Sequence, residues 1–599
     1  MERISQAIED IGSLCIADIF SPGKLWYAPV KMDWKTAPEF DPFGPMDRWG
    51  GYDEYGWFRC IFTIPAEADG KELWVEISQD KREWYAQNPQ FLLYCNEKPV
   101  QGLDLYHESC LLRKKAVSGE TLQLDFDAWA GMVTRGRTWS DKENRPGLFA
   151  IRFFTLEEDI QSFYYDIKTV YETAKYTDKE SEKGLRLRKI LNETIGQLDF
   201  REKNRFKQTL PEAKKILEQI WETERTENIQ AFCVGHTHID IAWMWRFQHT
   251  KMKVQRSFST ALKLLDEYPE YKFMSSQPQL YEYMEETQPE QFKKIQKYVQ
   301  ENRWEPEGGM WVEADCNLTS GESLIRQFLI GKKYFLGKFG KDSKVLWLPD
   351  VFGYSASLPQ ICKKCGIDYF MTTKISWNEK DKIPFDTFMW KGVDGTGLLT
   401  HFAPAKQYDK TDYNPFGFAR SPYITTYNGI LEPDYVMGGW KRYSQKALEP
   451  SFLIPYGYGD GGGGTTRDMI EKGKRMEKGI PGCPQVKFSD SLSFFQYLDQ
   501  KVKGKKELPE WNGELYLEFH RGTYTSVGEI KRLNRKAESK LQETEFLLCM
   551  AQCVSRGFTW DREQWEKMEK QFLTNQFHDI LPGSSITEVY EDVKKIYTE

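Results

Sequence analysis

The chain has 599 residues and a mass of 70.4 kDa, which is more than one hydrophobic core can organise, so we expect several domains. Its net charge of −7, without a basic run that could follow a phosphate backbone, argues against a nucleic-acid partner. No apolar run approaches the roughly 20 residues that cross a bilayer, so we expect no membrane partner. The N-terminus lacks the features of a signal peptide. The eleven scattered cysteines favour reduced thiols, so we expect a cytoplasmic protein.

Residues 1–155 are expected to form an N-terminal β-rich domain. Trp57–Pro65 and Leu73–Ile77 alternate apolar and polar side chains, and Asp69-Gly70 between them is a turn sequence, which together predict a hairpin. Further short strands with polar turns follow in the sequence. This pattern is typical of a β-sandwich.

Residues 156–227 are expected to form a helical connector. Apolar side chains such as Ile160, Phe163 and Ile167 recur at helical spacing. Pro211 is expected in the first turn of the last helix, where the missing amide hydrogen costs least.

Residues 228–510 are expected to form an α/β catalytic domain, because strands and amphipathic helices alternate there. Such alternation predicts βαβ units and a mainly parallel sheet covered by helices. Residues 405–450 are rich in Tyr, Pro and Gly and are expected to cross over this domain as a loop. The expected strands are Ala231–Val234, Tyr271–Met274, Val345–Leu348, Tyr369–Met371, Leu398–His401 and Phe452–Pro455.

Residues 511–599 return to a helical pattern, which predicts a C-terminal helical bundle segment. Leu533, Ala537 and Leu541 mark one helical face, and a second helix is expected from about Arg562 to His578.

A cluster of metal-ligating residue types follows the first strand of the α/β region. His236, His238 and Asp240 stand at alternate positions after Ala231–Val234. Open α/β folds bind ligands at the carboxyl ends of their strands, and imidazole with carboxylate is the ligand set of a catalytic divalent metal, most often zinc. The alternative from this motif alone is a set of satisfied polar residues at a strand end.

Two aspartates follow other predicted strands. Asp350 comes directly after Pro349, which ends strand pairing, although it could instead cap the next helix. Asp460 lies among six glycines, which let the backbone approach a ligand. A phosphate-binding loop is the competing interpretation, but no Gly-Lys-Ser/Thr closes the run. His578, near a helix end, is by itself more typical of a helix-terminal histidine.

Together these motifs give the chain a specific resemblance. The sequence resembles the α-mannosidases of glycoside hydrolase family 38, closest to the cytosolic-type branch with its N-terminal β-rich region. Gly235–Trp243 is similar to the family's first metal motif and Trp347–Ser355 to its nucleophile motif. Further matches in order and spacing are Asp460 in its glycine loop, Trp511–Tyr516 and Asn575–Asp579.

The resemblance implies a metal site. His238, Asp240, Asp350 and His578 would hold one divalent ion, zinc in the first place and cobalt as the alternative. His236 would then lie behind the site and orient one of these ligands.

The resemblance also implies the catalytic groups. Asp350 would be the nucleophile of a retaining mechanism and Asp460 the general acid and base. Trp243 would stack on the sugar ring. Hydroxyl contacts would come from three further residues, Asp579, Lys374 and Asp315.

The implied function is metal-dependent hydrolysis of terminal α-linked mannose from oligosaccharides or mannosides. The implied catalytic sheet is seven-stranded and barrel-like. Relatives continue into a large C-terminal β-domain, whereas this sequence stops at Glu599, so we expect that domain to be missing and residues 526–599 to be either self-associated in a homo-oligomer or locally loose.

Two other functions are compatible with these residues. A metal-dependent deacetylase or amidase would use His238, Asp240 and His578 with a water nucleophile, and it would release acetate instead of mannose. A truncated, inactive carbohydrate-binding protein would bind mannose without turnover.

Overall fold

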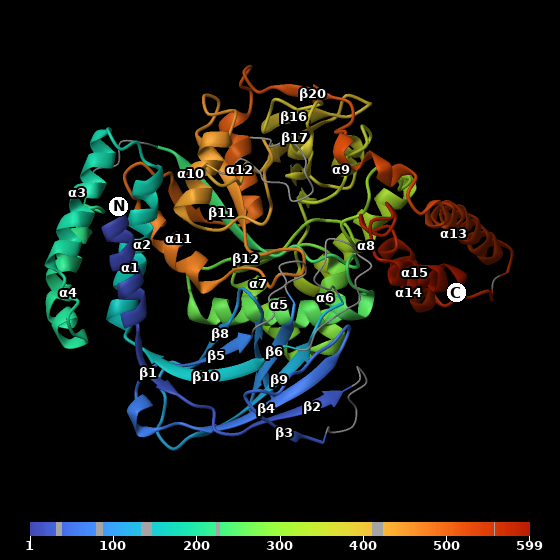
Figure 1. The fold of residues 1–599 in the computed structure, drawn as a ribbon. Helices are drawn as coiled ribbons and strands as arrows, with labels where there is room; N and C mark the ends of the chain where they lie inside the picture. Colours follow the sequence, from blue (N-terminus) through green and yellow to red (C-terminus); the bar gives the residue numbers. More distant parts are fainter. Residues whose placement is uncertain (31–38, 80–87, 133–146, 223–227, 410–422, 556) are drawn as a thin grey trace.

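The computed structural model describes residues 1–599 except 31–38, 80–87, 133–146, 223–227, 410–422 and 556. After an N-terminal helix, the chain forms in order a β-sandwich, a group of helices, an α/β region and three C-terminal helices (Figure 1). None of the described helices is both long enough and apolar enough to cross a membrane.

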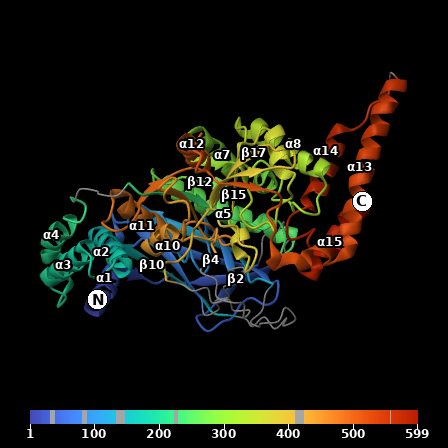
Figure 2. The same cartoon turned by 90° about the horizontal axis from the view of Figure 1, so that it is seen from above.

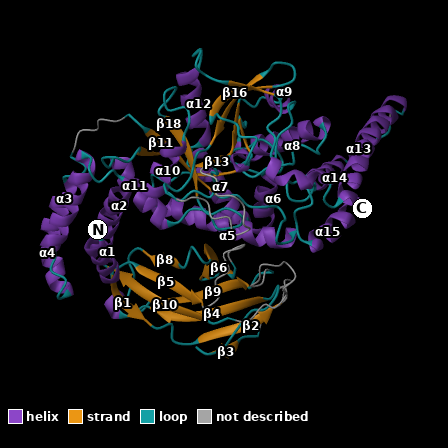
Figure 3. Ribbon diagram, turned by 45° about the horizontal axis from the view of Figure 1, so that its top comes forward, coloured by secondary structure: helices purple, strands orange, loops and turns teal. Residues whose placement is uncertain are grey.

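The N-terminal region is a β-sandwich with exclusively antiparallel pairing between its described strands (Figure 3). The rings of Phe62 and Phe153 stack across the two sheets with centroids 3.7 Å apart, inside a shared apolar core. One sheet has the order β1 (Ile16–Phe20), β10 (Phe149–Leu156), β5 (Leu73–Gln79), β8 (Ser109–Arg113); the other has β3 (Asp41–Phe43), β2 (Leu25–Val30), β4 (Tyr55–Thr63), β9 (Thr121–Trp129), β6 (Gln90–Cys95), β7 (Lys98–Leu103).

The expected hairpin of β4 and β5 is wrong, because these strands lie in opposite sheets. Both edges of β4 are taken by β2 and β9, and the chain between β4 and β5 crosses from one sheet to the other through a short 3-10 helix at Ala66–Ala68 and a turn at Gly70 (φ +73°). Alternating burial describes any strand with one buried face. It therefore does not identify the strand's partner.

Helices α1 (Glu2–Leu14), α2 (Glu158–Tyr176), α3 (Glu182–Gln197) and α4 (Lys203–Glu218) pack together beside the sandwich (Figure 1). The β-rich interpretation of residues 1–155 missed α1, which buries Ile4, Ile8 and Ile11. Helix α4 begins at Lys203, so Pro211 lies inside it and not in its first turn. Buried Leu210 and Ala213 flank this proline, and their packing keeps the helix continuous at the cost of one backbone hydrogen bond.

The α/β region contains two five-stranded sheets. All pairings are parallel except that of β16 with β17. One sheet has the order β13 (Trp304–Pro306), β12 (Phe273–Ser275), β11 (Gln230–His236), β18 (Ser451–Tyr456), with β19 (Gln485–Phe488) also on β11; the other has β14 (Val345–Trp347), β15 (Tyr369–Thr372), β17 (Gly397–Phe402), β16 (Thr387–Lys391), β20 (Glu510–Asn512).

The hydrogen-bond pairing differs from the expected single seven-stranded sheet. Among the described residues, the backbone pairing between β13 and β14 is a single bridge, that of Gly308 with Leu346. There the carboxylate of Glu307 accepts from the amides of Lys344 (3.0 Å) and Val345 (3.3 Å). The Glu307 side chain thus takes the amide hydrogens that would otherwise be available for backbone pairing between β13 and β14.

Helices cover these sheets and link them to the other regions (Figures 1 and 3). Residues 405–450, expected as a loop, contain helix α10, and residues 410–422 of that segment lie outside the described part. The helices are α5 (Phe247–Glu267), α6 (Pro278–Thr287), α7 (Pro289–Gln300), α8 (Gly321–Phe339), α9 (Leu358–Lys364), α10 (Pro433–Arg442), α11 (Arg467–Lys478) and α12 (Ser491–Val502).

The C-terminal helices are α13 (Gly528–Val554), α14 (Arg562–Thr574) and α15 (Thr587–Thr598). The far end of α13 projects beyond the rest of the molecule (Figure 2) and exposes Phe546, Leu547 and Val554. Helix α14 docks on α8, where Arg326 pairs with Glu569 at 2.7 Å. This docking positions the segment that follows α14.

Candidate active site

The candidate residues of the sheets lie where parallel strands end. His236 is the last residue of β11, and His238 and Asp240 follow it. Asp350 follows β14, and Asp460 follows β18, the neighbour of β11. Because parallel strands present their carboxyl ends at one edge, these side chains are collected there.

His578 reaches the same edge from the C-terminal helices. Helix α14 ends at Thr574, earlier than the expected end near His578, because the chain then turns and pairs with the segment after β13. Phe577 forms an antiparallel bridge with Ala314, and the amide of His578 donates to the carbonyl of Glu313 at 3.2 Å. Backbone pairing thus fixes where the imidazole enters the site.

His238, Asp240, Asp350 and His578 form one compact, buried cluster. Each offers a ligand atom, and these atoms all lie within 4.8 Å of one another. His238 Nε2 is 2.9 Å from Asp240 Oδ1, and His578 Nε2 is 3.6 Å from Asp240 Oδ1 and 3.7 Å from Asp350 Oδ2. The structure therefore brings together four predicted ligands from three distant segments.

Glu313 orients both histidines of the cluster. Its Oε2 lies 3.1 Å from His238 Nδ1, and its backbone carbonyl accepts from His578 Nδ1 at 2.8 Å. Both contacts turn the Nε2 atoms toward the carboxylates. Sequence reasoning does not single out Glu313, because it lies between elements in a segment without periodicity.

The donor set fits a divalent metal. His578 Nε2 is buried and has no hydrogen-bond partner among the described residues, a situation that costs about 1–3 kcal/mol unless a ligand relieves it. Burial lowers the pKa of His578, but the carboxylates of Asp240 and Asp350 outweigh it and raise the pKa to about 10. Two imidazoles and two carboxylates in one buried cluster match the nitrogen and oxygen ligands of catalytic zinc.

Asp350 is held ionised by a neighbouring cation. Burial disfavours its carboxylate, but Lys374 and His578 hold the pKa of Asp350 well below its usual range. Lys374 Nζ donates to Asp350 Oδ1 at 2.5 Å and lies 4.4 Å from the ring centroid of Trp377. The predicted residue Lys374 therefore contacts the predicted nucleophile directly.

Asp460 has the opposite electrostatic environment. Burial, followed by the charges of Asp240 and Asp350, raises the pKa of Asp460 to about 6. The hydroxyl of Tyr427 donates to Asp460 Oδ1 at 2.6 Å, and Asn428 Nδ2 donates to Oδ2 at 3.1 Å. Neither Tyr427 nor Asn428 is singled out by the sequence, because the tyrosine-rich segment 405–450 offers no spacing that distinguishes them.

His236 binds a different partner from the one expected. Its Nε2 donates to the carbonyl of Tyr427 at 2.7 Å, and burial lowers its pKa to about 4. His236 thus holds the Tyr427 backbone and none of the four cluster residues. Glu313 occupies the orienting position that the sequence interpretation gave to His236.

Three further candidates lie outside the four-residue cluster. Trp243 is half-buried, in contrast to the fully buried Trp245. Asp579 is buried and accepts from Ser584 Oγ at 2.5 Å, and burial with the charge of Asp240 raises its pKa to about 7. The third candidate is Asp315, whose Oδ1 accepts from the amides of Asn317 and Leu318 at 3.0 and 2.5 Å, which commits this oxygen to a backbone turn.

Comparison with known proteins extends these observations. Residues 228–514 match the N-terminal domain of glycosyl hydrolases family 38, and residues 518–599 match the alpha mannosidase middle domain. Alpha-mannosidase G of Dictyostelium discoideum is 34% identical over 584 residues, covering 95% of this chain and 50% of the relative. Human alpha-mannosidase 2C1 is 32% identical over 596 residues, with 98% and 53% covered. A crystal structure of an alpha-mannosidase from Enterococcus faecalis covers 62% of this chain and 41% of that one, with a TM-score of 0.51 and 19% identity, and so shares its fold.

The fold and the site define an α/β protein with a buried His₂Asp₂ cluster and one further carboxylate, Asp460, at the edge where its parallel strands end. The chain belongs to glycosyl hydrolase family 38. This confirms the resemblance inferred from the motifs. The chain spans about half the length of the named relatives it matches.

Proposed function

We propose that this chain carries the active site of a metal-dependent, retaining α-mannosidase that removes terminal α-linked mannose from oligosaccharides or mannosides. The family and the names of the relatives support this substrate class.

One observation carries the proposal: the environments of Asp350 and Asp460 separate their pKa values. Lys374 and His578 keep Asp350 ionised, whereas burial raises the pKa of Asp460 to about 6. A retaining glycosidase needs this pair, one ionised nucleophile and one carboxylic acid that can give a proton.

The proposed reaction follows from these states. Asp350 attacks the anomeric carbon while Asp460 transfers its proton to the leaving oxygen, so a glycosyl ester forms and the glycosidic bond breaks. Asp460, now ionised, then takes a proton from a water molecule while the oxygen of that water attacks the anomeric carbon. The glycosyl ester bond breaks, which releases mannose and frees the Asp350 carboxylate. Tyr427 and Asn428 direct the Asp460 carboxyl group throughout.

A divalent ion on His238, Asp240, Asp350 and His578 would supply positive charge beside the nucleophile and coordination positions for sugar hydroxyls. We propose zinc first, with cobalt as the alternative. The half-buried face of Trp243 is proposed to stack on the sugar.

The hydroxyl contacts are proposed for Lys374, Asp579 and Asp315. For Asp315 the oxygen Oδ2 is the proposed contact atom, because Oδ1 is bound to backbone amides.

The test is hydrolysis of a chromogenic α-mannoside by metal-stripped protein, with one divalent ion restored at a time. We expect mannose release only after metal is added, with zinc or cobalt most effective, and proton NMR should show that the first product is the α-anomer. Acetate release from an acetylated sugar, or mannose binding without turnover, would instead support the deacetylase or the inactive binding protein. A panel of 1,2-, 1,3- and 1,6-linked mannobioses then defines the preferred linkage.

Three further properties belong to the proposal. The domains are proposed as 1–155, 156–227, 228–510 and 511–599. The two family matches break near the last boundary, between residues 514 and 518, and β20 spans that boundary. All eleven cysteines are free, which supports a cytoplasmic location. Exposed Phe546, Leu547 and Val554 on α13 support self-association of the 599-residue chain, which light scattering can measure.

A further inference from the structure

A turn of the β-sandwich is buried beneath the α/β region. Asp104–Glu108 connect β7 of one sheet to β8 of the other. Asp104 Oδ1 accepts from the amides of Tyr106 (2.8 Å) and His107 (3.1 Å), which closes the turn. Asp104 and His107 are buried, although polar turns of a sandwich usually face water.

This turn contacts the glycine loop that carries Asp460. His107 Nε2 lies 3.0 Å from the carbonyl oxygen of Thr465, and its Nδ1 lies 3.0 Å from Asp104 Oδ1. Side chain and backbone fit closely here, because a Cβ on Gly463 would lie 2.8 Å from Asp104 Oδ2 and 2.9 Å from the His107 ring. Only glycine permits this approach.

Arg256 of α5 joins the turn to the loop. Its Nη1 lies 3.2 Å from Asp104 Oδ2, and its Nη2 donates to the carbonyl of Gly461, the residue after Asp460. Arg256 is 2% exposed. Removing one member would leave the other charge buried and unpaired, which makes the pair sensitive to substitution.

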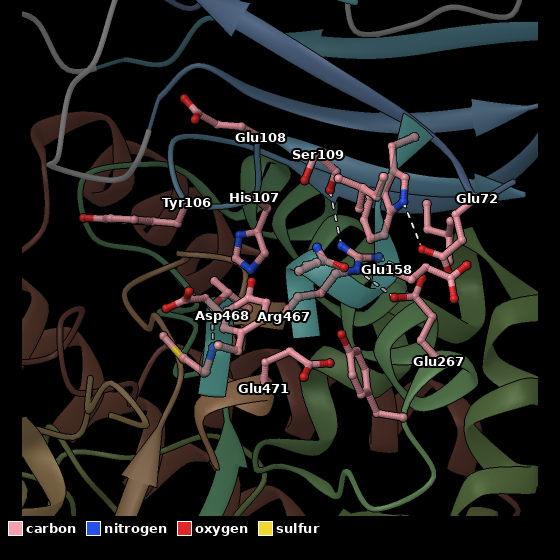
Figure 4. Close-up of a pocket in the computed structure, with 18 of the residues that line it drawn as sticks. Glu72, Tyr106, His107, Glu108, Ser109, Glu158, Glu267, Arg467, Asp468 and Glu471 are labelled. Carbon is pink, nitrogen blue, oxygen red and sulfur yellow. Dashed lines mark hydrogen bonds and ion pairs between the residues drawn. The ribbon is translucent and has the colours of Figure 1, made fainter. Parts of the chain in front are cut away.

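An aromatic contact links the same turn to the other end of the loop. The rings of Tyr106 and Tyr458 stack with centroids 3.7 Å apart and an angle of 8°. Figure 4 shows Tyr106 and His107 on the sandwich side of a cavity of about 550 Å³, with Arg467 and Asp468 opposite. The cavity leaves one side of the turn without packing. The turn is therefore held by the polar contacts of Asp104, His107 and Arg256 and by the stacked rings of Tyr106 and Tyr458.

The backbone of Asp460 needs such support. Asp460 has φ +56°, a left-handed conformation that non-glycine residues seldom adopt and that persists when the surroundings impose it. The neighbouring carbonyl of Gly461 is bound by Arg256, and the amide of Gly461 donates to the carbonyl of His238 at 3.2 Å. The direction of the Asp460 carboxyl group therefore depends on contacts outside its own loop.

We propose that Asp104, His107 and Arg256 are positioning residues for Asp460, and that the β-sandwich thereby forms a functional part of the active site. This inference rests on the proposed function of Asp460 as general acid and base. The sandwich turn sets the backbone of the loop, while Tyr427 and Asn428 set the carboxyl group itself.

The test compares two carboxylate-to-amide variants at the same interface. Asp104→Asn breaks the pair with Arg256. Glu267→Gln is the control, since the Glu267 side chain is only 7% exposed and pairs with Arg467 at 2.7 Å. Arg467 in turn donates to Gln101 Oε1 of the sandwich at 2.9 Å and does not contact the carbonyl of Gly461.

We expect Asp104→Asn to lose roughly tenfold or more in kcat/KM on mannobiose but less than about threefold on 2,4-dinitrophenyl α-mannoside, because an activated phenol needs little protonation. Glu267→Gln should change both substrates by the same factor. An equal loss on both substrates for Asp104→Asn, or the same split in Glu267→Gln, would overturn the proposal.

Hydrogen exchange provides a readout that does not depend on activity. Peptides covering residues 457–465 should exchange faster in Asp104→Asn than in Glu267→Gln, and unchanged exchange there would also overturn the proposal. If Asp104→Asn does not fold, Tyr106→Leu at the half-buried stacked ring replaces it with the same two expectations. A wild-type chain that is inactive on both mannosides would refute the proposed function. The exchange measurement still tests the positioning role in that case, because it does not depend on activity.

Discussion

Glu313→Gln tests how the candidate metal site is oriented. The amide has the same shape as the carboxylate, so its oxygen can still lie beside His238 Nδ1. Its NH₂ group can donate to Ser276 Oγ, the hydroxyl that now donates to Glu313 Oε1 at 2.6 Å. The backbone carbonyl that binds His578 Nδ1 is unchanged. The substitution therefore removes only the negative charge 3.1 Å from the His238 imidazole.

The expected magnitude follows from this geometry. Groups that orient a metal-bound histidine typically contribute about 10- to 100-fold to metal affinity, which corresponds to about 1.4–2.7 kcal/mol. Since the metal binds the folded state, stabilisation by a fixed excess of metal should fall by a similar amount.

The assay is competition between the protein and a zinc chelator of known affinity, together with thermal melting with and without metal. Glu307→Gln is the control, because Glu307 is 4% exposed against 2% for Glu313 but binds backbone amides of β14 away from the cluster. We expect weaker zinc binding in Glu313→Gln alone, with metal-free melting close to wild type. Unchanged zinc affinity in Glu313→Gln would refute the assigned role.

The other predictions concern residues that contact the proposed reaction directly. His578→Ala should lower both metal content and the metal-dependent rise in melting temperature, and unchanged stoichiometry by elemental analysis would contradict its role as a ligand. Asp350→Ala should be inactive on every substrate, whereas Asp460→Ala should keep most activity on an activated aryl mannoside; equal losses on aryl mannoside and mannobiose would argue against the acid role. Because the pKa of Asp460 is raised to about 6, its acid form is present below that pH, and kcat/KM on mannobiose should fall about tenfold per unit above it. The Tyr427 hydroxyl lowers that pKa, so Tyr427→Phe should move the fall to higher pH, and a shift to lower pH would reverse this assignment.

Strand ends explain why part of the site could be predicted from the sequence. His238, Asp240, Asp350 and Asp460 each follow a short apolar run, and parallel strands bring such positions to one edge. His578 carries no such signal, since it lies after a helix and enters through backbone pairing with Glu313. Only the family resemblance indicated it.

Contacts between segments account for what the sequence did not reveal. Glu313 contacts His238, which lies 75 positions earlier in the chain, and Tyr427 contacts Asp460, which lies 33 positions later. No periodicity in the sequence marks such pairs. The same limit affected the fold. The alternating pattern of β4 and β5 identifies both as strands but does not show that they lie in different sheets. The strand patterns also predict a continuous sheet where the Glu307 carboxylate interrupts the hydrogen-bond ladder.

His578 is translated long after the other three residues of the cluster. Glu313 and His578 are 265 positions apart, so at about 5–20 residues per second a ribosome needs on the order of 10–50 s to add the second after the first. Throughout that interval the nascent chain holds His238, Asp240 and Asp350 without the imidazole that completes the cluster. The order of synthesis thereby delays the complete four-residue cluster until His578 has been translated.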